Sequence, residues 1–193
     1  MNQIEKLIVE YLNENKIILD RGIVAFSGGI DSSFIAFILK KYYKNLLLVF
    51  VKTELIPENL LKIAINKAKI ISLPLKIINL KLLNIDEIRY NSENRCYFCK
   101  KFMYKTIKSQ YENIPIFDGT NYSDTFSYRP GIRAIEELKI LTPLKDCKIT
   151  KNEIIEFLDK KKPELLSPSD NCLATKFPYG TDLKEVIYAK KDN

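Results

Sequence analysis

Short apolar runs and amphipathic stripes alternate along most of the chain. The continuous apolar runs predict strands at 23–26, 46–51, 75–80, 114–117 and 140–144. Apolar residues at helical spacing predict helices over 4–12, 35–42, 57–71, 102–111, 132–138, 150–158 and 182–190. Because buried strands that alternate with helices are typical of a parallel sheet covered on both faces, we expect an α/β protein with a doubly wound, mostly parallel sheet of five strands.

The 193 residues fit one domain with a small appendage. Residues 160–171 are rich in Lys, Pro and Ser, as linkers often are. We therefore expect a main domain over residues 1–159. Residues 160–193 would form a C-terminal loop and a short helix.

The chain contains no histidine, which narrows the possible chemistry. A Ser-His-Asp triad, a Cys-His pair, a histidine-ligated zinc site and a histidine general base are all excluded. Catalysis would depend on Cys, Lys, Arg, Asp, Glu or Ser side chains, on backbone amides, or on a metal or cluster.

The formal net charge is +7, which favours anionic partners such as nucleotides, phosphorylated metabolites or nucleic acid. The alternative is a general lysine bias on solvated faces, since 31 basic residues include only five arginines. No signal-peptide pattern and no apolar stretch of membrane-spanning length occurs in the sequence, so we expect a cytoplasmic protein with no membrane partner.

The segment Ser27-Gly28-Gly29-Ile30-Asp31-Ser32-Ser33 joins the first predicted strand to a helix. Glycines permit close approach of a ligand to the backbone, the three serines offer hydroxyl donors, and a helix N-terminus attracts phosphate. A carboxylate beside phosphates is best explained by a bridging Mg²⁺, which assigns Asp31 to the metal. The alternative is an ordinary strand-to-helix turn in which Asp31 caps the helix.

Four cysteines are present, and two of them form a Cys-x-x-Cys pair at Cys96 and Cys99. With Cys172 they could hold an iron–sulfur cluster whose fourth position is open, which suits catalysis. A zinc site completed by Cys147 is equally compatible with the spacing, and buried unliganded cysteines are a further alternative. Cys147 itself has no partner motif and is expected to be structural.

Further motifs follow the Ser27–Ser33 loop in order along the chain. They are NRCYFCK (Asn94–Lys100), DGTN (Asp118–Asn121), YRPGIRA (Tyr128–Ala134) and NCLATKFPYG (Asn171–Gly180). The loop resembles that of the PP-loop ATP pyrophosphatases, and the set resembles the LarE family of ATP-dependent sulfur transferases in nickel-pincer nucleotide synthesis. The resemblance covers about Glu5 to Gly180. Two departures are Thr175-Lys176, where the family commonly has Ser-Arg, and the end of this sequence at Asn193, where family members continue.

The resemblance implies an adenine nucleotide α-hydrolase-like fold in which residues 1–159 form the ATP-binding domain. It implies ATP, Mg²⁺ and a [4Fe-4S] cluster on Cys96, Cys99 and Cys172. The implied reaction adenylates a carboxylate of a small anionic nucleotide, and sulfur then displaces AMP. Inorganic sulfide or a sulfur donor protein would supply the sulfur, and a homo-oligomer is possible in this family. Members with one cysteine, at the position of Cys172, instead sacrifice its sulfur.

Three more residues are candidate nucleotide or phosphate contacts. Thr53 and Gly119 follow predicted strands, and doubly wound sheets bind ligands at the carboxyl ends of their strands. Arg129 in the YRPG segment offers bidentate phosphate recognition, with a surface ion pair as the alternative. Two other functions stay open at this point: a cluster-dependent tRNA thiolase, although no RNA-binding pattern is seen, and a degenerate nucleotide-binding module.

Overall fold

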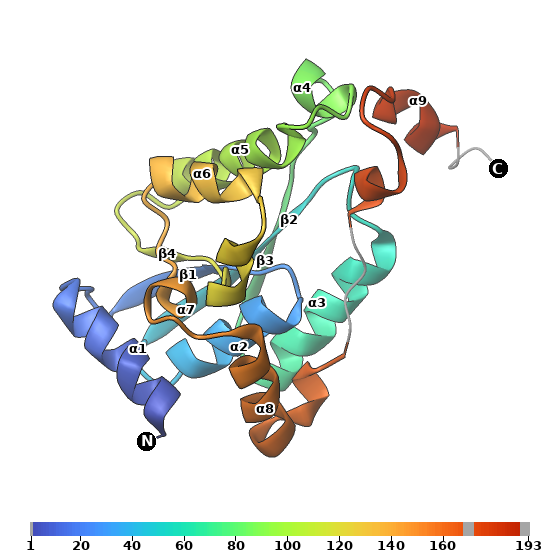
Figure 1. The fold of residues 1–193 in the computed structure, drawn as a ribbon. Coiled ribbons are helices and arrows are strands. Elements are labelled where there is room, and N and C mark those ends of the chain that lie inside the picture. Colours follow the sequence, from blue (N-terminus) through green and yellow to red (C-terminus); the bar gives the residue numbers. More distant parts are fainter. Residues whose placement is uncertain (1, 168–171, 190–193) are drawn as a thin grey trace.

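The computed structural model describes residues 2–167 and 172–189. Its centre is a parallel sheet of four strands in the order β3-β2-β1-β4 (Figure 1). The strands are β1 (Arg21–Ala25), β2 (Asn45–Lys52), β3 (Leu75–Asn79) and β4 (Ile116–Phe117). In register, Val24 of β1 lies opposite Leu48 of β2, and Phe50 of β2 lies opposite Ile77 of β3. The predicted α/β class and parallel sheet are confirmed.

Helices cover both faces of the sheet (Figure 1). One face packs against α1 (Gln3–Glu14), α2 (Ile30–Leu39), α3 (Glu58–Ile71), α7 (Pro143–Asp146) and α8 (Lys151–Lys161). The other packs against α5 (Arg95–Gln110) and α6 (Pro130–Glu137). Successive strand residues point to opposite faces, so Val24 joins the first core and Ile23 the second. This two-sided burial explains why the strands are continuous apolar runs.

The prediction of a fifth strand at 140–144 is wrong for the described residues. Leu141 forms a single parallel bridge with Phe117, in which its N–H donates to the Ile116 carbonyl at 2.9 Å. Pro143 follows at the start of α7, and proline has no N–H with which to continue a strand ladder. The chain therefore turns into a helix after one bridge.

Two other boundaries differ from the prediction. Helix α5 begins at Arg95, so Cys96 and Cys99 lie in its first turns and not in an irregular segment ahead of it. Helix α8 continues to Lys161, and a 3₁₀ turn over Pro163–Leu165 follows, with Leu165 buried in the main core. The first part of the predicted 160–171 loop is thus ordered. Residues 168–171 lie outside the described part of the chain.

A third core lies where the C-terminal segment packs against residues that follow β2 and β3. It contains Leu55, Leu82, Leu83, Ile88, Ala174, Leu183 and Ile187. Through it, a 3₁₀ turn (Leu173–Lys176) and helix α9 (Leu183–Tyr188) approach α4 (Asp86–Arg89), as Figure 1 shows for α9 and α4. Asp182 caps α9 and accepts a hydrogen bond from Arg89 Nε at 2.9 Å. Cys99 and Cys172 pack against the same core, which brings both ends of the cysteine motif together.

Among the described helices, none combines the length and the apolar character that crossing a membrane would require.

Candidate nucleotide and cysteine site

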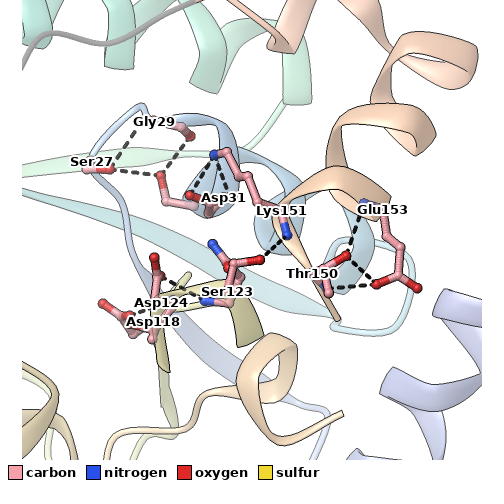
Figure 2. A network of polar contacts seen from close by, with 12 residues as sticks. Ser27, Gly29, Asp31, Asp118, Ser123, Asp124, Thr150, Lys151 and Glu153 are labelled. Atoms are coloured by element: carbon pink, nitrogen blue, oxygen red, sulfur yellow. Dashed lines mark hydrogen bonds and ion pairs between the residues drawn. The ribbon is translucent and has the colours of Figure 1, made fainter. Parts of the chain in front are cut away.

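The glycine loop after β1 is closed onto the first turn of α2 (Figure 2). Gly28 has a φ of +75°, and a Cβ there would lie 2.8 Å from the Ala64 Cα, so the loop needs glycine for both conformation and space. The Gly29 N–H donates to Ser27 Oγ at 3.2 Å, and Ser32 Oγ donates to the Gly29 carbonyl at 3.1 Å. These contacts preform a concave loop at a helix N-terminus, the arrangement that binds phosphate groups.

Asp31 does not cap α2, because Gly29 occupies the N-cap position. Its carboxylate instead meets Lys151, whose Nζ lies 2.8 and 2.9 Å from the two carboxylate oxygens (Figure 2). Burial raises the pKa of Asp31, while Lys151 opposes that rise. Lys151 is the first residue of α8, and its N–H donates to Ser123 Oγ at 3.1 Å, which fixes the start of that helix near the loop. The Lys151 ammonium group therefore occupies the position beside Asp31 in which Mg²⁺ was predicted.

The turn after β4 faces the same loop. A Cβ on Gly119 would lie 2.7 Å from the Ser32 amide nitrogen, so the two turns touch through backbone. Buried Asp118 accepts hydrogen bonds from Tyr104 and from the Thr120 N–H at 2.7 Å, and it lies 3.3 Å from Lys100 Nζ. Burial alone would raise the pKa of Asp118, but Lys100 and these hydrogen bonds hold it below its ordinary value. The carboxylate is thereby kept charged inside the protein.

A cavity of about 320 Å³ opens between these turns. Six of the predicted nucleotide residues line it: Ser27, Gly29, Asp31, Ser32, Gly119 and Arg129. The other three do not line it: Gly28 packs on Ala64, Ser33 is fully buried in α2, and Thr53 accepts a hydrogen bond from the Leu55 N–H at the end of β2. Arg129 forms an ion pair with Asp124 at 2.9 Å, which is the alternative predicted for it, yet it faces the cavity as well.

A second cavity, of about 550 Å³, adjoins the first and reaches Cys96. Its wall includes Arg95, Cys96 and the exposed rings of Tyr128 and Tyr179. The two cavities have four lining residues in common: Lys100, Thr120, Asp124 and Arg129. The glycine loop and the start of α5 thus open onto two adjoining cavities that have these four residues in common.

Three of the four cysteines gather around Arg95. Its Nη2 donates to Cys96 Sγ at 3.4 Å, and its guanidinium interacts electrostatically with Cys99 and Cys172 as well. Burial raises the pKa of both the Cys99 and the Cys172 thiols. Cys147 lies elsewhere, at the end of α7 with its thiol 3.5 Å from the Leu7 carbonyl, so it does not complete a four-cysteine site.

Buried Asn91 forms hydrogen bonds both to the segment that follows Cys172 and to the start of α5, which carries Cys96 and Cys99. Its side-chain amide donates to the carbonyls of Phe177 at 2.9 Å and Pro178 at 2.7 Å, and its oxygen accepts from Arg95. The backbone φ at Asn91 is +47°, a conformation that asparagine adopts more readily than most residues. One side chain therefore holds the Leu173–Lys176 turn and the start of α5 in register.

The residue types present fit an iron–sulfur cluster. Within residues 2–167 and 172–189, no three His, Cys, Asp or Glu side chains converge closely enough to hold one metal ion. Three thiols around a buried cation fit the anionic, sulfur-ligated character of a four-iron cluster. Mg²⁺ needs only one or two carboxylates together with substrate phosphates, and Asp31 and Asp124 both line the nucleotide cavity.

The sequence did not predict a role in this site for four residues: Asn91, Arg95, Lys100 and Lys151. Arg95 and Lys100 flank the Cys-x-x-Cys pair, so their place in the motif was an available signal. Lys151 directly follows the capping residue Thr150, and only the packing of α8 brings it to Asp31. Nothing in the local pattern singled out Asn91.

No protein-family model matches the chain. It is 39% identical over 164 residues to an uncharacterised protein of Methanocaldococcus jannaschii, covering 83% of this chain. It is 26% identical over 171 residues to pyridinium-3,5-bisthiocarboxylic acid mononucleotide synthase of Lactiplantibacillus plantarum, covering 86% of this chain. The chain spans 62% of the length of each of these two relatives.

Among solved structures, the fold is similar to that of the U34-tRNA thiolase NcsA of Methanococcus maripaludis, described with its [4Fe-4S] cluster. The TM-score is 0.62 at 18% identity, over 98% of this chain and 72% of that one. At that identity the likeness concerns the fold. The fold is that of the PP-loop ATP pyrophosphatases, and in sequence the chain is similar to the lactobacillar synthase.

Proposed function

We propose that the protein is an ATP-dependent sulfur transferase that adenylates a carboxylate and replaces the adenylate with sulfur. The observation that carries the proposal is the continuity of the two cavities through Lys100, Thr120, Asp124 and Arg129. A nucleotide in the glycine loop and an acceptor beside Cys96 would then meet at this shared wall. The similarity to the lactobacillar synthase supports an acceptor of the pyridinium carboxylate nucleotide class, as in nickel-pincer cofactor synthesis.

In the first step, an acceptor carboxylate oxygen attacks the α-phosphorus of ATP and the bond to the leaving pyrophosphate breaks. The loop N–H groups would bind the pyrophosphate oxygens, and Asp31 would hold Mg²⁺, which would supply positive charge to the leaving group. Lys151 would then be free to turn to the phosphates. Arg129 and Lys100 lie at the shared wall, where charge on the α-phosphate needs compensation. Neither group has to move a proton, which agrees with a site that lacks histidine.

In the second step, a sulfide equivalent attacks the acyl carbon, AMP leaves, and the acceptor is released as a thiocarboxylate with loss of one proton. Cys96, Cys99 and Cys172 would hold a [4Fe-4S] cluster, which supplies a non-sacrificial sulfur carrier when bound. Residues 1–159 would bind the nucleotide, and residues 160–193 would supply the third cysteine. Sulfide or a donor protein would provide the sulfur, and self-association would be possible.

The test is pyrophosphate release from Mg·ATP with candidate carboxylate nucleotides, on protein purified without oxygen and assayed for iron and sulfide. Acceptor-dependent pyrophosphate release, with AMP and thiocarboxylate formed in equal amounts, is expected. Absence of pyrophosphate release with any carboxylate acceptor would contradict the adenylation step and favour a non-catalytic nucleotide-binding module.

A tRNA thiolase is the second candidate, and exposed aromatic side chains near the acceptor cavity favour it. Phe126, Tyr128 and Tyr179 are all more than half exposed. Arg129 lines the second cavity together with Tyr128 and Tyr179, and Phe126 precedes it by three residues in the sequence. Exposed aromatic rings next to cations can stack unpaired bases of RNA. Salt-sensitive binding of tRNA, together with tRNA-dependent pyrophosphate release, would favour this candidate over the small acceptor.

A further inference from the structure

Two exposed tyrosine rings line the second cavity from separate parts of the chain. Tyr128 precedes α6 and is 85% exposed, and Tyr179 lies in the C-terminal segment and is 66% exposed. Within the described residues, neither ring stacks on another aromatic ring and neither hydroxyl forms a hydrogen bond. Large apolar side chains that are exposed together at a cavity commonly mark a ligand site. We call these two residues the tyrosine pair.

The backbone around Tyr179 is held in a defined turn. The Pro178 carbonyl accepts hydrogen bonds from the Asn91 side-chain amide at 2.7 Å, from Thr181 Oγ1 at 2.9 Å and from the Thr181 N–H at 3.4 Å. Gly180 has a φ of +84°, which suits the third position of such a turn. The chain is therefore fixed on both sides of Tyr179, while its ring is left exposed at the cavity.

The backbone next to Tyr128 is held as well. The following residue, Arg129, forms an ion pair with Asp124 at 2.9 Å, and Pro130 then begins α6 with a φ that its ring restricts. An exposed ring on an ordered backbone loses little conformational freedom when a ligand stacks on it, because tyrosine has only two side-chain torsions. Both members of the tyrosine pair are thus prepared to bind a planar group.

The positive charges of the second cavity lie on a different part of its wall. Lys100 and Arg129 line both cavities, whereas the tyrosine pair lines only the second. A planar ring stacked on the tyrosine pair could therefore direct negatively charged substituents towards the wall shared with the nucleotide cavity. The volume of about 550 Å³ is in the range of small-molecule sites.

We infer that the tyrosine pair positions a planar, positively charged heteroaromatic ring of the pyridinium type and selects it over neutral rings. The face of a tyrosine ring attracts a cation, so a pyridinium gains this attraction in addition to stacking, and a neutral base gains stacking alone. Lys100 and Arg129 would then receive a carboxylate of the same ligand. The assignment of this ring as the acceptor rests on the proposed function, whereas the preference for a cationic ring does not.

The experiment measures binding to the full chain without ATP, by ligand-observed NMR titration. The probes are nicotinamide mononucleotide, which contains a pyridinium, its reduced form, whose ring is neutral, and uridine monophosphate. We expect nicotinamide mononucleotide to bind about fivefold more tightly than either neutral-ring probe. The reduced form is more negative by one charge, so a general attraction to a basic protein would favour it and produce the opposite order.

Variants locate the effect on the two rings. Tyr128→Leu and Tyr179→Leu should each weaken binding of nicotinamide mononucleotide by about threefold, and Tyr128→Phe and Tyr179→Phe should keep it, because the aromatic face remains. Phe102→Leu, at a partly exposed ring of α5 that lines neither cavity, is the control and should leave binding unaltered. Both tyrosine side chains are largely exposed, so these variants should unfold at the wild-type temperature.

No binding of nicotinamide mononucleotide, or equal binding of its oxidised and reduced forms, would overturn the inference, and neither measurement needs a variant. Unchanged affinity in both leucine variants would overturn it too. Uridine monophosphate binding as tightly as the pyridinium would overturn it in favour of stacking of unpaired RNA bases. Failure of the proposed function is a separate result, because pyrophosphate release tests adenylation and these titrations contain no ATP.

Discussion

The two cavities share a wall but treat charge differently. The three aspartates that line the nucleotide cavity each face a cation: Asp31 faces Lys151, Asp118 faces Lys100, and Asp124 faces Arg129. In the cysteine cavity the buried Arg95 has thiols and an amide as partners. In the first region the carboxylates are paired before a ligand arrives, so Mg·ATP, if it binds there as proposed, would have to exchange partners, for example by displacing Lys151. In the second region no carboxylate pairs with Arg95 among the described residues, so an anionic group such as the proposed cluster could bind there without displacing a partner.

The two regions also differ in how they are built. The nucleotide loop is held by the sheet and by close backbone contacts at Gly28 and Gly119. The cysteine region depends on side-chain hydrogen bonds from Asn91 and on a small core assembled from distant segments. If this contrast is correct, variants should separate nucleotide chemistry from sulfur chemistry.

The largest effect is expected for Asp31→Asn. Removing the carboxylate takes away the charge that balances Lys151 and that we propose to hold Mg²⁺, so ATP-dependent pyrophosphate release should fall by about a thousandfold. Iron content and thermal unfolding should stay close to wild type, since the cysteine region is untouched. Asp20→Asn, at an exposed carboxylate, is the control. Undiminished pyrophosphate release would remove Asp31 from the metal site.

The reciprocal experiment replaces each cysteine by alanine. Cys96→Ala, Cys99→Ala and Cys172→Ala should each lose bound iron and sulfur transfer but retain pyrophosphate release, and Cys147→Ala should keep all three. Intact-protein mass spectrometry after turnover should show Cys172 unchanged. A loss of mass equal to hydrogen sulfide at Cys172, with Cys96→Ala and Cys99→Ala still active, would point to a sacrificial cysteine instead.

Asn91→Ala tests how the cysteine region is held together. The change removes the side-chain amide of the buried Asn91, which donates to the carbonyls of Phe177 and Pro178 and accepts from Arg95, so the free energy of unfolding should fall by about 2–3 kcal/mol. Asn91→Gly restores backbone freedom at φ +47° and should recover only the smaller, conformational part. Urea unfolding measures both, and equal stability of Asn91→Gly and wild type would show that the amide contributes nothing.

The smallest effect concerns Lys67, a buried lysine of α3 whose Nζ donates to the Ser167 carbonyl at 2.8 Å. Burial lowers its pKa to about 8 from 10.5, so between those values the unfolded chain binds more protons than the folded one. Wild-type stability relative to Lys67→Met should therefore rise by about 1–3 kcal/mol as the pH increases from below 8 to about 10.5. A pH-independent difference would mean that Lys67 titrates normally.

Sequence patterns predicted this fold well where burial alone decides it. The runs at β1, β2 and β3 are apolar because both faces of the sheet are covered, and the Thr150–Glu153 capping box marks the start of α8. The secondary-structure prediction failed where a single residue interrupts an apolar run or where a helix lacks a clear apolar stripe. Pro143 ended the expected fifth strand, and the helix around Cys96 is polar enough to resemble a loop.

The sequence by itself determined the parallel α/β fold, the glycine loop, and the cysteine types and spacing that point to sulfur chemistry, because each depends on local periodicity or on neighbouring residues. Only the tertiary structure decided that Lys151 lies on Asp31, that Lys100 reaches Asp118, and that Asn91 joins α5 to the segment after Cys172. It also places the buried Arg95 beside the Cys96 thiol, with no carboxylate paired to it in the described part of the chain. Lys100 and Asp118 are 18 residues apart and Lys151 and Asp31 are 120 apart, and the cores pack such partners together without leaving a periodic signal in the chain.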